Sequence, residues 1–437
     1  MQTNFSIKQL ADSQTSESNR ILRRCVHCGF CTATCPTYQI LGDELDSPRG
    51  RIYLIKQMLE EDRPADAETV KHIDRCLSCL SCMTTCPSGV HYMHLVDHAR
   101  EYIEETYKRP VGDRLLRSLL TFLLPKPSMF RLSLRGAQIA RPFKGLFPAK
   151  LRNMIEMAPK ALPKPSVVDR QRVIPAEGKR LKRVALMTGC AQKVLDPDIN
   201  DATIRILTRH GCEVVIPEDT GCCGALPHHM GKSDASHGYA EKNIRAWQRE
   251  LEGEGLDAIV INTSGCGTMV KDYGYLYRDH EELSEVSKRL SDITCDITEL
   301  LMQLDLQPAE KTEALRVTYH AACSLQHGQK ITTAPKILLK KAGYEISEPA
   351  ESHLCCGSAG VYNLLQPELA SQLQDRKVGH IRATEPQVIA AGNIGCITQI
   401  AAKMEVPVVH TVELLDWATG GPKPKKLSSF NSNIETR

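Results

Sequence analysis

The sequence predicts a multidomain α+β protein, in which a small helical module is followed by two repeated α/β domains with parallel sheets. Its 437 residues are too many for one compact core. Two cysteine runs of identical spacing lie near the N-terminus, and a second cysteine pattern occurs twice after residue 189. Short apolar runs alternate with helical segments around that repeated pattern, which is typical of parallel sheets covered by helices.

The cysteine patterns, the charge distribution and the polar ends divide the chain into segments. The composition, 42% hydrophobic and 24% charged, is that of a globular protein. The predicted boundaries are a polar N-terminal tail at 1–15, a helical module at 16–107 with cysteine motifs in 16–45 and 66–97, a basic helical connector at 108–182, the first repeated domain at 183–300, the second at 314–418, and a polar C-terminal tail at 419–437.

The two N-terminal cysteine runs predict iron–sulfur ligation. Residues 25–36 (CVHCGFCTATCP) and 76–87 (CLSCLSCMTTCP) both follow C-x2-C-x2-C-x3-C-P, a spacing typical of ferredoxins with two [4Fe–4S] clusters. Three closely spaced thiolates can wrap three corners of one cube, while the fourth begins a helix and reaches the other cube. Zinc sites instead use four ligands in paired knuckles. The predicted ligands are Cys25, Cys28, Cys31 and Cys86 for the first cluster, and Cys35, Cys76, Cys79 and Cys82 for the second.

The connector is strongly basic. Residues 108–183 carry 19 Lys and Arg against 4 Asp and Glu, a net charge of +15, whereas the whole chain carries +3. Short apolar patches are interleaved with these charges. The segment could therefore dock on an anionic membrane surface or an acidic partner subunit, or it could be a solvated linker on the domain surface. Nothing in it indicates nucleic-acid binding.

The second half of the chain contains an internal repeat. The spacing between Cys190 and Cys222 recurs between Cys323 and Cys355, with an offset of 133 residues, and one further cysteine follows each copy. Strands are predicted at 183–188, 213–217, 258–262, 316–320 and 388–391, and helices at 198–210, 231–250 and 334–342. Cysteines at the carboxyl ends of parallel strands would converge where α/β folds bind ligands.

This cysteine pattern resembles the CCG domain of heterodisulfide reductase-like subunits. The fullest form of that motif ends in C-x2-C, whereas the two copies here end in Cys266-Gly-Thr-Met269 and Cys396-Ile-Thr-Gln399, so the fifth thiolate is missing. Each copy could hold a further iron–sulfur cluster, a metal ion or a redox-active thiol pair, or could be a structural relic. The residues concerned are Cys190, Cys222, Cys223, Cys266, Cys323, Cys355, Cys356 and Cys396.

With both modules considered, nearly the whole chain resembles the iron–sulfur subunits of bacterial glycolate oxidases. The matching segments include CVHCGFCTATCPTYQ, LGDELDSPRGRIYLIKQMLE, CLSCLSCMTTCPSGVHY, TGCCGALPHH, SGCGTMVKDYG and SHLCCGSAGVYNLLQPELA. The resemblance implies a complex with two FAD-linked oxidase subunits that oxidise glycolate to glyoxylate, and a quinone-type membrane acceptor. This chain would transfer electrons and contain no catalytic residue. The alternatives are the equivalent subunit of a lactate or glycerol 3-phosphate dehydrogenase, or a redox-sensing or cluster-storage protein.

The sequence also predicts where the protein acts. Residues 1–20 contain neither an apolar signal core nor a twin arginine, and the apolar stretch at 115–124 is interrupted by Arg117. Eighteen cysteines without an export signal indicate metal ligation in a reducing compartment. We therefore expect a cytoplasmic protein, in peripheral contact with the inner face of the cytoplasmic membrane at most.

Overall fold

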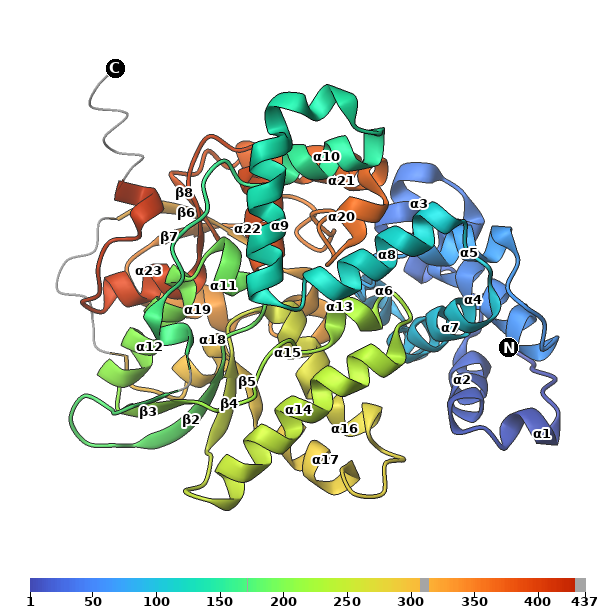
Figure 1. Cartoon of the computed structure of the whole chain (residues 1–437), viewed down its shortest axis with the longest axis horizontal. Coiled ribbons are helices and arrows are strands. Elements are labelled where there is room, and N and C mark those ends of the chain that lie inside the picture. Colours follow the sequence, from blue (N-terminus) through green and yellow to red (C-terminus); the bar gives the residue numbers. More distant parts are fainter. Residues whose placement is uncertain (171, 307–313, 429–437) are drawn as a thin grey trace.

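The computed structural model describes residues 1–170, 172–306 and 314–428. The N-terminal helical module lies at one end of the molecule, and two domains that each contain a sheet form the remainder (Figure 1). This is the predicted α+β arrangement of a helical module and two α/β repeats.

The N-terminal module is entirely helical. Its core is formed by apolar side chains that face one another across the helices, among them Ile55, Met58 and Leu95, which are fully buried. The helices are α1 (Ile7–Leu10), α2 (Ser13–Arg24), α3 (Pro36–Leu41), α4 (Pro48–Glu60), α5 (Ala67–Asp74), α6 (Ser81–Thr85) and α7 (Tyr92–Thr106), with 3-10 turns η1 (Phe30–Thr32) and η2 (Glu44–Asp46).

Two details of this module differ from the sequence prediction. The polar tail predicted at 1–15 is folded, because Ser6 caps α1 and Asp12 caps α2 through their side chains. Cys35 begins helix α3 with proline in its first turn, as expected, but Cys86 does not begin a helix. Gly89, with φ of +63°, ends a turn after Cys86, and the next helix starts only at Tyr92.

The connector is mostly helical, and it also supplies a strand. It contains α8 (Val111–Leu123), α9 (Pro127–Ala140), η3 (Arg141–Leu146), α10 (Ala149–Met157), η4 (Val167–Asp169) and β1 (Arg172–Ile174). Strand β1 pairs antiparallel with β3 at the edge of the first sheet. A three-residue strand at an edge depends on its neighbour for hydrogen bonds, so its own sequence pattern does not reveal it.

The first repeat is built on the sheet order β1-β3-β2-β4-β5, and all its strands except β1 are parallel. The strands are β2 (Lys182–Met187), β3 (Cys212–Ile216), β4 (Ala258–Ile261) and β5 (Thr294–Asp296). The helices are α11 (Gln192–Leu195), α12 (Asp198–Arg209), α13 (Ala225–His228), α14 (Ser233–Glu252), α15 (Ser264–Lys271), α16 (Tyr273–Leu276), α17 (Ser284–Asp292) and α18 (Ile297–Leu301).

The second repeat has the parallel order β7-β6-β8-β9, which reproduces the order β3-β2-β4-β5 of the first. The internal repeat read from the cysteines is therefore also a repeat of topology. The strands are β6 (Arg316–His320), β7 (Glu345–Ser347), β8 (Val388–Ala391) and β9 (Val408–His410). The other elements are the π-helical turn η5 (Ser324–Gly328) and helices α19 (Ala334–Lys341), α20 (Tyr362–Leu365), α21 (Pro367–Arg382), α22 (Ile394–Ala401) and α23 (Thr411–Ala418).

One apolar cluster joins the two repeats, and the first repeat has a second cluster of its own. Buried side chains of both sheets, such as Val184 and Val317, belong to the same cluster. Asp416 on α23, which is 1% exposed, accepts hydrogen bonds from Arg205 and Arg209 on α12. At the C-terminal end, which was predicted to be a polar tail, Lys425 forms an ion pair with Asp198 at 2.7 Å.

The N-terminal module contacts both repeats. His94 on α7 lies 3.0 Å from a carboxylate oxygen of Asp272 and stacks on Tyr275, in the first repeat. Tyr362 of the second repeat donates a hydrogen bond of 3.1 Å to the carbonyl of Arg75. A Cβ on Gly231 would lie 2.3 Å from the Arg100 carbonyl, so glycine permits α7 to approach the first repeat closely. Among the helices of the described residues, none is long and apolar enough to span a membrane.

Candidate iron–sulfur site and cysteine clusters

The two N-terminal cysteine loops contain the same backbone turns. In each loop, the second residue after the first cysteine and the residue after the second cysteine have positive φ: His27 (+55°) and Gly29 (+86°) in one, Ser78 (+50°) and Leu80 (+62°) in the other. Left-handed residues between right-handed ones turn successive backbone N–H groups toward a common point, a geometry found at iron–sulfur sites. Glycine adopts the φ of +86° at Gly29 without the steric cost that a Cβ would add.

These loops enclose two adjacent cavities. Each cavity receives three cysteines from one loop and the fourth cysteine of the other loop, and Cys82 borders both. The cysteines that line the first cavity are Cys25, Cys28, Cys31 and Cys86, and those that line the second are Cys35, Cys76, Cys79 and Cys82. Four thiols are thus available to a group in each cavity, and the shared wall would hold two such groups close together.

Burial favours the protonated form of several of these thiols. Burial raises the pKa of Cys31 to about 11 and raises the pKa of Cys79 and Cys82 well above its usual value. The side chain of Cys28, in contrast, is exposed. A buried set of thiols becomes favourable when a metal replaces the protons, and eight cysteines in this arrangement fit iron–sulfur ligation.

A buried arginine stands beside the second cavity. Arg51 on α4 is 1% exposed, its Nη1 lies 3.8 Å from Cys35 Sγ, and its Nη2 lies 3.3 Å from Asp46. Asp46 is fully buried and also accepts a hydrogen bond of 2.7 Å from Arg75. The Tyr92 hydroxyl donates a hydrogen bond to Cys76 Sγ, at 3.7 Å. Positive charge and hydrogen bonds at the sulfurs are factors that tune the potential of an iron–sulfur cluster.

The four cysteines of the first repeat converge at the carboxyl ends of the strands. Cys190 follows β2, Cys222 and Cys223 precede α13, and Cys266 lies in the first turn of α15 after β4. Neighbouring thiols interact in the order Cys190, Cys222, Cys223 and Cys266, and these interactions together with burial raise the pKa of Cys190 and Cys223 well above its usual value. A Cβ on Gly224 would lie 2.8 Å from the Ser236 carbonyl, so the glycine of the CCG motif allows α14 to approach.

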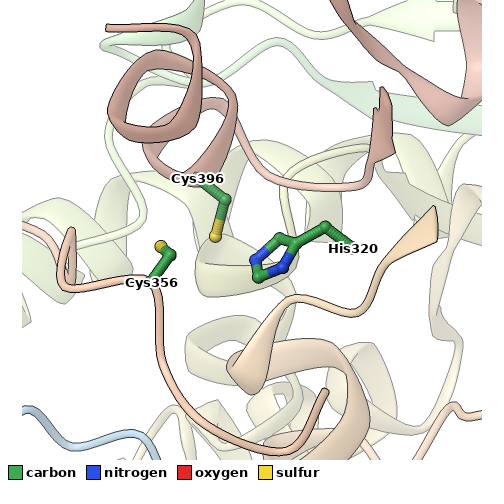
Figure 2. Close-up of side chains that lie close together, drawn as sticks. All are labelled: His320, Cys356 and Cys396. Carbon is green, nitrogen blue, oxygen red and sulfur yellow. The ribbon is translucent and has the colours of Figure 1, made fainter. Parts of the chain in front are cut away.

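The second repeat gathers its cysteines in the same way and adds a histidine. Cys323 donates to Cys355 with an Sγ–Sγ distance of 3.8 Å, and hydrogen bonds from Cys355 and Cys396 lower the pKa of Cys356. Figure 2 shows the ring of His320, at the end of β6, directed toward the sulfurs of Cys356 and Cys396.

Sequence reasoning did not identify His320 as a member of this group. The signal that could have found it is the repeat offset of 133 residues, which aligns His320 with Met187 at the end of β2 and shows where the copies differ. Its partners lie far along the chain, so no local motif marks it.

The cysteines of the second repeat lie next to the second N-terminal cavity. Cys79 packs in one apolar cluster with Leu77, Cys355 and Leu369, and Cys323 contacts the same cluster. Thr84 on α6 is also hydrogen-bonded to His327 of the second repeat, at 2.8 Å. Cysteines of the N-terminal module and of the second repeat therefore pack in one apolar cluster, and no layer of polar side chains separates them.

Comparison with known families agrees with this architecture. Residues 21–90 match the family described as a 4Fe-4S dicluster domain, and residues 184–271 and 317–401 match the family described as a cysteine-rich domain. The fold and the cysteine-lined cavities thus define an iron–sulfur electron-transfer protein that joins a dicluster module to paired cysteine-rich domains. The chain is 40% identical to the glycolate oxidase iron–sulfur subunit of Escherichia coli, over 96% of this chain and 99% of that protein. It belongs to the family of glycolate oxidase iron–sulfur subunits and is an oxidoreductase subunit.

Other relatives are consistent with this family. The chain is 33% identical to the probable glycolate oxidase iron–sulfur subunit of Bacillus subtilis, over 91% of this chain and 94% of that protein. It is 28% identical to lactate utilization protein A of Bacillus licheniformis, over 54% of this chain and 99% of that protein. A crystal structure of a hypothetical protein from Helicobacter pylori is similar in fold, with a TM-score of 0.51 and 12% identity, over 96% of this chain and 76% of that one.

The buried arginine generates a prediction about potential. Arg51→Gln removes a positive charge near Cys35 Sγ. Because reduction adds one negative charge to a cluster, a cluster held in the second cavity should have a lower reduction potential in this variant. A fall of about 60 mV corresponds to a tenfold change in a one-electron equilibrium. The measurement is a redox titration followed by EPR.

Arg49→Gln is the matched control for this measurement. Arg49 borders the first cavity and is partly exposed. Its removal should lower the reduction potential of a cluster held in the first cavity, and by less, because water screens its charge. Unchanged potentials in Arg51→Gln at full iron content would contradict the assigned role of Arg51.

Proposed function

We propose that this chain is the electron-transfer subunit of a flavin-dependent glycolate oxidase complex and that it binds two [4Fe–4S] clusters. The ligands of the first would be Cys25, Cys28, Cys31 and Cys86, and those of the second Cys35, Cys76, Cys79 and Cys82. The observation that carries this proposal is the pair of adjacent cavities, each lined by one of these sets. When bound, such clusters accept and donate single electrons.

The two cavities differ in exposure, which suggests the direction of electron flow. Cys28 is exposed at the first cavity, beside Val26 and Phe30, which are 67% and 62% exposed. The second cavity is enclosed by Cys79, Cys82 and the second repeat. We therefore place the entry of electrons from a partner at the first cavity and their onward transfer at the second.

The oxidation of the substrate carbon is assigned to partner subunits. Two FAD-linked oxidase subunits would oxidise glycolate to glyoxylate, and a quinone would accept the electrons that this chain delivers. The role of this chain is to hold the clusters, exclude water from the second cavity and set their potentials through residues such as Arg51. No catalytic residue is assigned to it.

A lactate-linked complex is the second candidate function. It is favoured by the similarity to proteins named for lactate utilization, although these match only about half of this chain. The subunit of a glycerol 3-phosphate dehydrogenase would need the same electron-transfer module.

Removing one proposed cluster ligand from the second cavity tests the function directly. In the purified complex, Cys79→Ser should abolish reduction of a quinone by glycolate, while glycolate still reduces the flavin, because electron transfer through this chain follows the chemistry at carbon. Stopped-flow absorbance reports the flavin, and quinone reduction is assayed separately. L-lactate, D-lactate and glycerol 3-phosphate serve as comparison substrates.

Two results would contradict this function. One is loss of flavin reduction in a Cys79→Ser complex whose subunits still co-purify. The other is wild-type activity on one of the comparison substrates and none on glycolate. That result would contradict the assignment of glycolate as substrate, but not the electron-transfer role of this chain.

The connector supports a proposal about location. Val111, Leu115, Leu119 and Phe122 lie on one face of α8 and are exposed, Leu115 at 68% and Phe122 at 49%. Lys126 lies over the Phe122 ring, and this part of the chain is rich in lysine and arginine. We propose that this apolar, basic face binds the anionic inner surface of the cytoplasmic membrane, near the quinone.

Vesicle binding tests this location. We expect the complex to sediment with anionic phosphatidylglycerol vesicles in a salt-dependent manner and not with neutral phosphatidylcholine vesicles, because each basic residue near the surface contributes about 1 kcal/mol. Leu115→Glu with Phe122→Glu should weaken binding about tenfold or more, whereas Ile7→Glu, an exposed apolar residue elsewhere, should not. Equal binding to both vesicle types, or to neither, would overturn this proposal.

A further inference from the structure

Ionisable side chains line the contact between helix α7 and the first repeat. Helix α7 passes beside α13 (Figure 1), and it carries His94, which pairs with Asp272, and one turn further Asp97. Asp97 is 9% exposed and faces His228 at the end of α13. Removing charged groups from water costs free energy that apolar packing would avoid. The charges at this contact are therefore candidates for a role beyond packing.

Asp97 connects His228 to the cysteine loop of the second cavity. Asp97 Oδ2 lies 3.2 Å from His228 Nε2, and Asp97 Oδ1 lies 3.7 Å from Nη1 of Arg100. Arg100 is 7% exposed and donates hydrogen bonds to the Cys76 carbonyl, at 2.7 Å, and to Ser78 Oγ, at 2.6 Å. Both acceptors belong to the loop that lines the second cavity. A continuous series of polar contacts thus runs from that loop to His228.

One ring nitrogen of His228 is placed to take up a proton. His228 Nδ1 is buried and has no hydrogen-bond partner among the described residues. Because Nε2 faces the Asp97 carboxylate, we assign the proton of the neutral ring to Nε2, so that protonation occurs at Nδ1. Burial by itself would lower the pKa of His228, but the carboxylates of Asp97 and Asp272 raise it above its usual value.

The charges that surround His228 favour this proton. Asp97 and Asp272 are negative and Arg100 is positive, which leaves one negative charge that a protonated ring compensates. Burial lowers the pKa of the two nearby histidines, which favours their neutral forms. The groups that face His228 are Asp97 and Arg100 on α7, Asp272 after α15, His229 in the same turn and His237 on α14.

We propose that His228 takes up a proton from solvent when the group in the second N-terminal cavity accepts an electron, and returns it to solvent when the electron leaves. The inference rests on the proposed function, in which a partner flavin supplies the electron and a quinone-type acceptor removes it. One N–H bond forms at Nδ1 for each electron that arrives, so the total charge of the region is unchanged. Asp97 and Arg100 are positioning residues, since they hold the ring against the Cys76 loop.

Redox titration of the anaerobic full-length chain at several pH values, followed by EPR, tests this coupling. The reduction potential of a cluster in the second cavity should fall as pH rises, from one plateau to a lower one. The ring is protonated in both redox states on the acid side and in neither on the alkaline side, so the potential changes only between its two pKa values. A total change of about 59 mV, or tenfold in the one-electron equilibrium, corresponds to one unit between those pKa values.

Three variants separate His228 from its neighbours. His228→Gln should abolish the pH dependence and keep the potential near the lower plateau, because the amide still donates to Asp97 but binds no proton. Asp97→Asn should move the pH dependence to lower pH, because it removes the carboxylate that raises the pKa of His228. His229→Gln is the matched control. Its Nδ1 lies farther from Asp97, at 4.0 Å, so this variant should keep the wild-type pH dependence.

Iron content distinguishes failure of this coupling from failure of the proposed function. A wild-type chain that contains iron but whose potential is constant between about pH 5.5 and 9 would overturn the role of His228 and leave the proposed function intact. Unchanged pH dependence in His228→Gln, or its loss in His229→Gln, would also overturn it. A chain without iron would overturn both proposals. If His228→Gln itself loses iron, the direction of the shift in Asp97→Asn decides.

Discussion

The N-terminal module depends on the convergence of eight cysteines, most of them buried, on two adjacent cavities. Buried thiols are protonated and contribute little beyond their small apolar volume, so a helical module of this size gains little stability from clustering them. Metal binding changes this, because iron replaces the protons of the buried thiols. The free energy of metal binding then contributes to the free energy of folding. The left-handed residues at matching places in both loops are understandable on the same basis, since their strain is compensated when the loops surround a bound group.

The cysteine-rich repeats show how a duplicated fold can diverge at one position. Both copies keep the parallel order, the CCG loop and a cysteine in the first turn of a helix after the third strand. The copies differ at the end of the first strand, where the first has Met187 and the second His320. Only the cysteines of the second copy pack against Cys79. The second copy is therefore the one whose thiols are placed to influence a group bound in the second N-terminal cavity.

Much of the architecture could be predicted from the sequence, because it is encoded in local patterns. The apolar runs at 316–320 and 388–391 form strands β6 and β8 with the predicted bounds, and the cysteine repeat indicates the topological repeat. Strands β5 and β9 have three residues each and exist because a longer neighbour supplies hydrogen bonds, so periodicity could not reveal them. His320 was missed for a related reason: its partners, Cys356 and Cys396, come close only when the sheet assembles.

The most direct test of the central claim is the iron and acid-labile sulfide content of the full-length chain, purified without oxygen. Two cubes in the N-terminal cavities predict about eight irons and eight sulfides per chain, with the EPR spectrum of two interacting reduced clusters. A preparation that contains no iron, or one in which zinc occupies the N-terminal cysteines, would contradict the account.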